Sequence, residues 1–165
     1  MGPSKAPRVL FLCTGNYYRS RFAERLFAHL GPKQGLDWEA ESRGLFQARD
    51  PYNVGFMSPH TLSRLEGMGV DPGPRDRFPI RVTEEDLKSA TRTIALDESE
   101  HRAMLEGQFP DWSERVDYWQ VHDLDRATPE SALTDIETRV RRLVEALFEV
   151  NTGEAGRVRR FSAPL

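Results

Sequence analysis

A short apolar run, a polar loop and an amphipathic segment, in that order, constrain the fold of this chain most. Residues 9–12 (Val-Leu-Phe-Leu) form a continuous apolar run, which is typical of a strand buried on both faces of a sheet. After the loop, apolar residues recur at helical spacing at positions 22, 23, 26, 27 and 30, and Gly31-Pro32 ends the pattern. These residues predict a central strand, a loop and a helix.

Three further segments have strand character. Residues 38–42 are expected to form a second strand, residues 93–96 a buried third strand, and residues 116–121 the last strand. They are separated by segments with helix signals, so strands and helices alternate along the chain. Alternation of this kind predicts right-handed crossovers between parallel strands.

The helix starts are indicated by capping residues. Ser58-Pro59 is typical of an N-cap followed by proline at the first helical position, and this helix is expected to end near Gly67. Residues 83–86 (Thr-Glu-Glu-Asp) indicate a capped acidic first turn. Two pairs resemble capping boxes and predict two more helix starts. They are Asp97 with Glu100, and Thr134 with Glu137.

These elements predict an α/β fold with a doubly wound, mostly parallel four-stranded sheet and helices on both faces. The chain has 165 residues, enough to bury a core without disulfides or metal, and we expect a single domain over residues 1–165. Residues 1–7 and 151–165 are expected to be tails. In such a fold ligands bind outside the carboxyl ends of the strands, where the loop after Leu12 lies.

Charge and cysteine content exclude several classes of protein. Lys and Arg total 23 against 26 Asp and Glu, so the net charge of -3 gives no general attraction to nucleic acid or to an acidic membrane. The longest apolar run, residues 9–13, is far shorter than the ~18 residues of a membrane helix. A single cysteine rules out an internal disulfide and favours a reducing compartment, so we expect a cytoplasmic protein.

The four histidines have no spacing typical of a metal site, and we expect solvated surface positions for all of them. They are His29, His60, His101 and His122. We therefore expect no metal and no cofactor. Neither nucleic acid nor a membrane is an expected partner, and the oligomeric state stays open.

The loop after the first strand has the composition of an anion-binding nest. Backbone N–H groups and a helix N-terminus attract a tetrahedral anion, and Gly15 and Asn16 tolerate left-handed backbone angles. The planar guanidinium of Arg19 can grip two phosphate oxygens. The substrate-binding residues expected in this loop also include four others. They are Thr14, Tyr17, Tyr18 and Ser20.

Cys13 lies at the mouth of this nest and is a candidate nucleophile. A thiolate is an anion, so a site built for anions favours it over the neutral thiol. Ser20 can donate a hydrogen bond to that thiolate and ease its departure from phosphorus. The donors that hold phosphate also match a transition state whose charge is spread over three equatorial oxygens.

The sequence from residue 9 resembles the signature of the low-molecular-weight protein tyrosine phosphatases, a strand running into Cys, five residues, Arg and Ser. Three distal segments are similar to family segments in the same order, so the resemblance covers about residues 9–148. They are residues 95–99 (Ala-Leu-Asp-Glu-Ser), 42–44 (Ser-Arg-Gly) and 83–86.

The resemblance implies metal-independent hydrolysis of aryl phosphomonoesters, with phosphotyrosine in proteins or a small aryl phosphate as substrate. It implies a phosphocysteine intermediate on Cys13, with Arg19 binding phosphate and a late aspartate as general acid. Alignment places that acid at Asp123, where the family's Asp-Pro becomes Asp123-Leu124, and an insertion before Thr134 leaves Asp125 as the alternative. It also implies that Asn16 braces the loop by bonding to Ser42.

Three residues depart from the family pattern. Arg21 replaces the proline after Arg-Ser, and the added cation suggests a preference for acidic substrates. Tyr18 stands in place of a second loop cysteine, and Leu124 in place of the proline after the acid. Two alternatives stay open, and the first is motivated by Arg21 and the missing Asp-Pro. One is a phosphatase-fold module that binds phosphoanions or phosphoproteins with little turnover. The other is an arsenate reductase, which needs further thiols that this chain lacks.

Overall fold

The computed structural model describes residues 5–46 and 53–162, with side chains as far as residue 152. Its centre is one four-stranded sheet in the order β2-β1-β3-β4, and every neighbouring pair is parallel. This confirms the predicted fold class. The strands are β1 (Arg8–Cys13), β2 (Glu39–Gly44), β3 (Arg92–Ala95) and β4 (Asp117–Tyr118).

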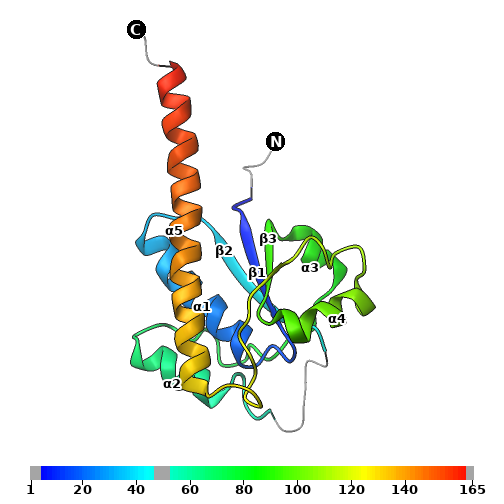
Figure 1. Cartoon of the computed structure of the whole chain (residues 1–165). Helices are drawn as coiled ribbons and strands as arrows, with labels where there is room; N and C mark the ends of the chain where they lie inside the picture. Colours follow the sequence, from blue (N-terminus) through cyan, green and yellow to red (C-terminus); the bar gives the residue numbers. More distant parts are fainter. Residues whose placement is uncertain (1–4, 47–52, 163–165) are drawn as a thin grey trace.

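Helices cover both faces of the sheet (Figure 1). The side chains of Val9 and Phe11 pack with residues of α1, α2 and α5, whereas Leu10 and Leu12 pack with residues of α3 and α4. This division follows from the period of two along a strand, which sends alternate residues of β1 to opposite faces. The helices are α1 (Arg19–Lys33), α2 (Pro59–Gly67), α3 (Glu84–Ser89), α4 (Glu98–Gln108) and α5 (Pro129–Ser162).

Two of the helix starts form as the sequence predicts. Ser58 accepts a hydrogen bond from the N–H of His60 at 3.2 Å, and Pro59 occupies the first turn of α2. In α3, Thr83 and Asp86 form a reciprocal capping box, with distances of 2.9 and 3.2 Å. Both signals depend on adjacent residues only, so they hold regardless of tertiary packing.

The two other capping boxes predicted from the sequence are wrong. Asp97 does cap α4, since its carboxylate accepts from the N–H of Ser99 at 3.1 Å, but Glu100 turns its carboxylate to other partners, described below. Helix α5 begins at Pro129, so Thr134 lies inside it. The hydroxyl of Thr128 accepts from the N–H of Ser131 at 3.2 Å, and proline at the next position favours this earlier start.

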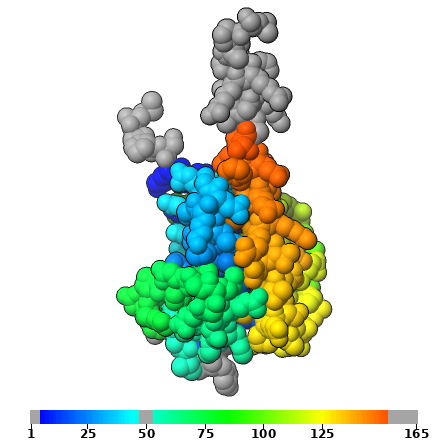
Figure 2. Space-filling model, turned by 90° about the vertical axis from the view of Figure 1, so that its left-hand side faces the viewer, coloured from blue at the N-terminus to red at the C-terminus, as the bar shows by residue number. Residues whose placement is uncertain are grey.

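The last helix is the longest and packs along α1, as Figure 2 shows for the face where the orange and blue residues meet. It continues to Ser162, through most of the segment expected to be a tail. Residues 1–4 and 163–165 of the expected tails lie outside the described residues.

The final strand is shorter than predicted. Only residues 117–118 pair with β3, although Gln120 forms a bridge to Asp97. Beyond it, the N–H of Val121 donates to the carbonyl of Leu96 at 2.8 Å. That bond brings the segment after β4 to the carboxyl ends of the central strands, where β1 also ends.

Candidate active site

Backbone N–H groups of other segments bind the carbonyl groups of the loop between β1 and α1. The carbonyls of Cys13, Thr14 and Tyr17 accept hydrogen bonds of 2.8 to 2.9 Å from the N–H groups of Leu45, Phe46 and Ser58. Within the described residues, the N–H groups of residues 14–18 find no acceptor. They are therefore available to an anion at the positive end of α1.

Asn16 has a left-handed backbone with φ of 52°, as its residue type predicts, whereas Gly15 does not. The Asn16 side chain joins the loop to its surroundings. Its amide nitrogen donates to the hydroxyls of Ser20 and Ser42, both at 2.9 Å, and the Ser42 bond agrees with the expectation. Its oxygen accepts from Arg77 at 3.1 Å and from the N–H of Ile80 at 3.0 Å.

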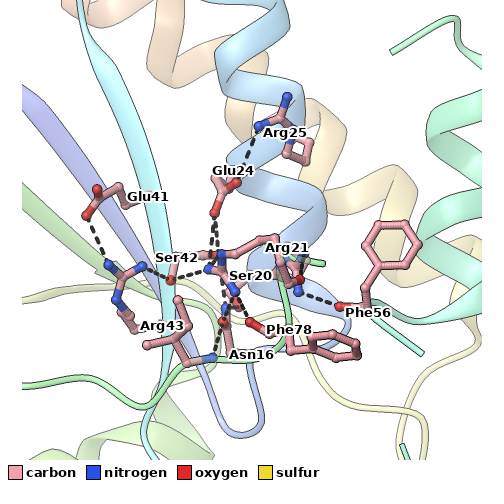
Figure 3. Close-up of polar contacts among 12 residues, drawn as sticks. Asn16, Ser20, Arg21, Glu24, Arg25, Glu41, Ser42, Arg43, Phe56 and Phe78 are labelled. Atoms are coloured by element: carbon pink, nitrogen blue, oxygen red, sulfur yellow. Dashed lines mark hydrogen bonds and ion pairs between the residues drawn. The ribbon is translucent and has the colours of Figure 1, made fainter. Parts of the chain in front are cut away.

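A second layer of charge supports Asn16 (Figure 3). Ser42 donates to the carboxylate of Glu24 at 2.6 Å, and Arg77 lies 3.7 Å from the same carboxylate. Arg77 also donates to the carbonyl of Ser42 at 3.0 Å. Arg77 and Glu24 have no signal in the sequence, because neither belongs to a recognisable local motif.

The Sγ atom of Cys13 lies 2.9 Å from the hydroxyl oxygen of Ser20, as expected for a hydroxyl that supports a thiolate. Cys13 is 3% exposed, yet it lines a cavity of about 440 Å³ at the carboxyl end of β1. Two expected substrate-binding residues, Asn16 and Ser20, are fully buried and do not line this cavity. The loop residues in the wall are Cys13, Thr14, Gly15, Tyr17, Tyr18 and Arg19.

Arg19 is buried and sits among acceptors. One terminal nitrogen donates to the carbonyl of Val121 at 2.9 Å, and the other to the Glu100 carboxylate at 2.7 Å. The second nitrogen also lies 3.6 Å from the Asp123 carboxylate. Burial alone would lower the pKa of Arg19, but the negative charges of Cys13, Glu100 and Asp123 outweigh it and raise that pKa.

Glu100 is a site residue that sequence reasoning missed, since its only visible signal was the mistaken capping box. Its Oε2 atom accepts from Arg19, from the hydroxyl of Thr14, and from Nε2 of His101 at 2.9 Å. Burial would raise the pKa of Glu100, but hydrogen bonds from His101 and Thr14 and the charge of Arg19 hold it well below its usual range. Glu100 is therefore an anion in the cavity wall.

The structure brings both candidate acids to the cavity. Asp123 and Asp125 line it together with Leu124. Asp123 is the one beside Arg19, and its other oxygen accepts from the N–H of Leu124 at 2.9 Å. Asp125 makes no ion pair among the described residues. Of the two candidate acids, Asp123 is therefore the one within ion-pair distance of Arg19 among the described residues.

Tyr17 and Tyr18 form an aromatic part of the wall. The hydroxyl of Tyr17 donates to the carbonyl of Val54, and the Tyr18 ring meets His60 edge-on with a centroid distance of 6.3 Å. Burial, followed by the charge of Asp123, raises the pKa of Tyr18 to about 12. Both phenols are thus neutral aromatic surfaces at neutral pH.

Two expectations from the sequence are wrong. Arg21 does not face the cavity, because it is fully buried and donates to the carbonyls of Phe56 at 2.6 Å and Arg77 at 2.9 Å. It therefore gives no reason to expect acidic substrates. His101 is not a surface residue, since it is fully buried beside Glu100. His122 is engaged as well, with Nδ1 2.7 Å from the Asp97 carboxylate.

No helix in the described ranges is long and apolar enough to cross a membrane. Among the same residues, no group of three or more His, Cys, Asp or Glu side chains is arranged to hold a metal ion.

Comparisons of the sequence with known proteins agree on one family of phosphatases. The family model described as low molecular weight phosphotyrosine protein phosphatase matches residues 8–152. A protein-arginine-phosphatase of Bacillus subtilis (strain 168) is 28% identical over 108 residues, which is 66% of this chain and 67% of the relative. The low molecular weight protein-tyrosine-phosphatase YfkJ of the same organism is 33% identical over 93 residues, 54% of this chain and 55% of the relative.

A solved structure has the same fold. The low molecular weight protein tyrosine phosphatase from T. tengcongensis superposes with a TM-score of 0.71 and 28% identity, covering 86% of this chain and 99% of that one.

Proposed function

Because the chain belongs to the low molecular weight phosphotyrosine protein phosphatase family, we propose that it hydrolyses aryl phosphomonoesters, with phosphotyrosine in proteins as the substrate class. The observation that carries this proposal is the 2.9 Å contact between Cys13 and Ser20 at a loop whose N–H groups are available to an anion. The neutral rings of Tyr17 and Tyr18 in the same wall suit an aryl group.

In the first step, the thiolate of Cys13 attacks phosphorus and the bond from phosphorus to the ester oxygen breaks. Asp123 in its acid form gives its proton to the departing oxygen, so an alcohol or phenol leaves instead of an anion. The loop N–H groups and Arg19 hold the three equatorial oxygens of the transition state. The product of this step is a phosphocysteine.

In the second step, the same carboxylate, now ionised, takes a proton from a water molecule that attacks phosphorus. The bond from sulfur to phosphorus breaks and inorganic phosphate forms. Ser20 donates to the departing thiolate, which lowers the energy of that anion. Apart from the attacking water, every group in both steps belongs to the chain or to the substrate.

The test is turnover of an aryl phosphate without added metal by the wild type and by Cys13→Ser. We expect the variant to lose turnover but to bind inorganic phosphate, because the donors of the loop remain. Hydrolysis by Cys13→Ser near the wild-type rate would show that Cys13 is not the nucleophile. Phosphate binding by a wild type that turns over neither aryl phosphate nor phosphoarginine would instead favour the binding module.

Phosphoarginine in proteins is a second candidate substrate, and Glu100 is the observation that favours it. All three donors to Glu100 converge on Oε2, and within the described residues none reaches Oε1. A carboxylate oxygen in the cavity wall can accept from the N–H groups of a guanidine, whereas it repels a second anion. One of the relatives is a protein-arginine-phosphatase.

Glu100→Gln separates the two substrates. If the guanidine contacts Oε1, the variant should lose more activity towards a phosphoarginine peptide than towards a phosphotyrosine peptide, because the weakened contact with Arg19 affects both substrates. Glu106→Gln, on the exposed side of the same helix, is the matched control. Equal losses for both peptides would remove the support that Glu100 gives to phosphoarginine.

A further inference from the structure

The residues before and after Asp123 both form side-chain hydrogen bonds with the start of α4. Before Asp123, Nδ1 of His122 lies 2.7 Å from Oδ2 of Asp97. After it, Arg126 donates to the hydroxyl of Ser99 at 3.1 Å. The candidate acid therefore stands between two side chains that bind neighbouring residues of one helical turn.

The carboxylate of Asp97, which binds His122, is itself held in place by burial and by Ser99. It is 1% exposed, and its Oδ1 atom accepts from the N–H of Ser99 at 3.1 Å and from the hydroxyl of Ser99 at 2.8 Å. Burial would raise the pKa of Asp97, but hydrogen bonds from His122 and Ser99 lower it below its ordinary value. Since an ionised carboxylate only accepts hydrogen bonds, Nδ1 of His122 carries the proton and donates it to Asp97.

The same turn of α4 also holds the phosphate-binding loop. Asp97 Oδ2 lies 3.9 Å from Arg19, and Glu100 binds both Arg19 and Thr14. The N–H of Asp97 donates to Nδ1 of His101 at 3.0 Å, so the proton of a neutral His101 ring is on Nε2, which faces Glu100 at 2.9 Å. One rigid turn thus connects the loop of Cys13 with the segment of Asp123.

Among the described residues, backbone hydrogen bonds join the acid segment to the sheet only as far as Val121, and the carbonyl of Asp123 accepts only from Arg126 and Ala127 of the same segment. Strand β4 has only two residues, and Leu124 and Asp125 after the acid are exposed. Leucine at position 124 does not restrict the backbone as proline would. The hydrogen bond between His122 and Asp97 therefore restrains the position of Asp123, which the two-residue strand β4 does not reach.

We propose that His122 is a positioning residue, whose hydrogen bond to Asp97 sets where the Asp123 carboxylate stands relative to Cys13. This inference rests on the proposed function, since the position of Asp123 matters only if that carboxylate exchanges protons with the substrate and water. His122 itself touches neither. His122 affects the reaction only through the position of the adjacent Asp123.

The experiment compares His122→Ala with His122→Asn, whose amide nitrogen lies near the place of Nδ1. Misplacement of a catalytic group by about 1 Å costs on the order of 10²-fold in rate. We expect His122→Ala to lower kcat by about 10- to 100-fold for an aryl phosphate with a poor leaving group. With an activated leaving group the loss should be small, KM should change little, and His122→Asn should recover most of the rate.

His29→Ala is the matched control, because His29 lies ten residues beyond Arg19 on α1, about 15 Å along the helix. Both His122 variants are compared with wild type for thermal unfolding. If His122→Ala does not fold, His122→Gln replaces it, since its amide is one carbon too far for the same bond. The double variant of His122→Ala with Asp123→Asn should be no slower than Asp123→Asn alone.

The outcomes separate this inference from the proposed function. If Asp123→Asn shows no dependence on the leaving group, Asp123 is not the acid and the inference falls with that assignment. If Asp123→Asn shows the dependence but a folded His122→Ala or His122→Gln variant does not, the proposed function stands and the positioning role of His122 is wrong. Additive losses in the double variant would also overturn the positioning role.

Discussion

Arg19 and Glu100 lie 81 residues apart in the chain, yet a guanidinium nitrogen of one is 2.7 Å from a carboxylate oxygen of the other. Arg19 therefore has an internal anionic partner at the position where a substrate phosphate is to be held. The pair keeps the guanidinium beside the loop in the absence of ligand, because an unpaired buried charge is costly.

This pairing makes part of the stability depend on pH. The pKa of Glu100 is depressed in the folded protein, so its contribution is fully present above its unfolded pKa of about 4.3 and is lost as the pH falls towards the folded value. Thermal unfolding of the wild type between pH 6 and 3 should therefore show a steeper loss than that of Glu100→Gln. Glu106→Gln should follow the wild type, and identical slopes for Glu100→Gln and wild type would contradict the prediction.

The general acid can be identified by its dependence on the leaving group. Asp123→Asn should reduce kcat by roughly 10²- to 10⁴-fold for a poor leaving group and much less for an activated one, because only the former needs a proton. Asp125→Asn is the matched control, since Asp125 lines the same cavity without contacting Arg19. If Asp125→Asn alone shows the pattern, the acid is Asp125.

Gly44 is expected to be essential for the shape of the nucleophile loop. A Cβ atom at this position would lie 3.0 Å from the carbonyl oxygen of Thr14, 3.1 Å from the nitrogen of Asn16 and 3.1 Å from the carbonyl carbon of Gly15. All three are backbone atoms of the loop, so Gly44→Ala must displace it.

We therefore expect Gly44→Ala to lower both kcat and the melting temperature. Gly107→Ala is the comparison, because a Cβ there meets no atom within 4 Å. In helix α4 that change should be neutral or stabilise by up to about 1 kcal/mol. A Gly44→Ala variant with wild-type kinetics would show that the loop tolerates the shift.

Oxidation of Cys13 should be hard to reverse. A thiolate reacts with peroxide to give a sulfenic acid, and a neighbouring cysteine would trap that product as a disulfide. Tyr18 occupies the neighbouring loop position, and the sequence contains no second cysteine. Prolonged peroxide should therefore carry Cys13 to sulfinic and sulfonic acids, which reductant does not restore.

The measurement is activity and intact mass after peroxide, with and without glutathione, followed by reductant. Glutathione should preserve recoverable activity as a mixed disulfide of higher mass. Full recovery without any added thiol would contradict this prediction, as would a Cys13 that resists peroxide altogether.

Much of the fold was accessible from the sequence because its signals are local. The apolar run of β1, the Ser58-Pro59 start of α2 and the capping box of Thr83 each depend on residues within one turn or strand. The start of α5 was mistaken because two local signals competed, and proline at position 129 prevailed over Thr134.

The sequence by itself also determined the contents of the loop: its nucleophile candidate Cys13, the left-handed position of Asn16, and the Arg19-Ser20 pair that begins α1. Only the tertiary structure decided which side chains surround them. Glu100, Arg77 and the pair of His122 with Asp97 come from other elements, while Arg21, adjacent to the loop, turns away into the core. The physical reason is range: backbone preferences are set by adjacent residues, whereas contacts between distant side chains exist only after the sheet and helices have packed.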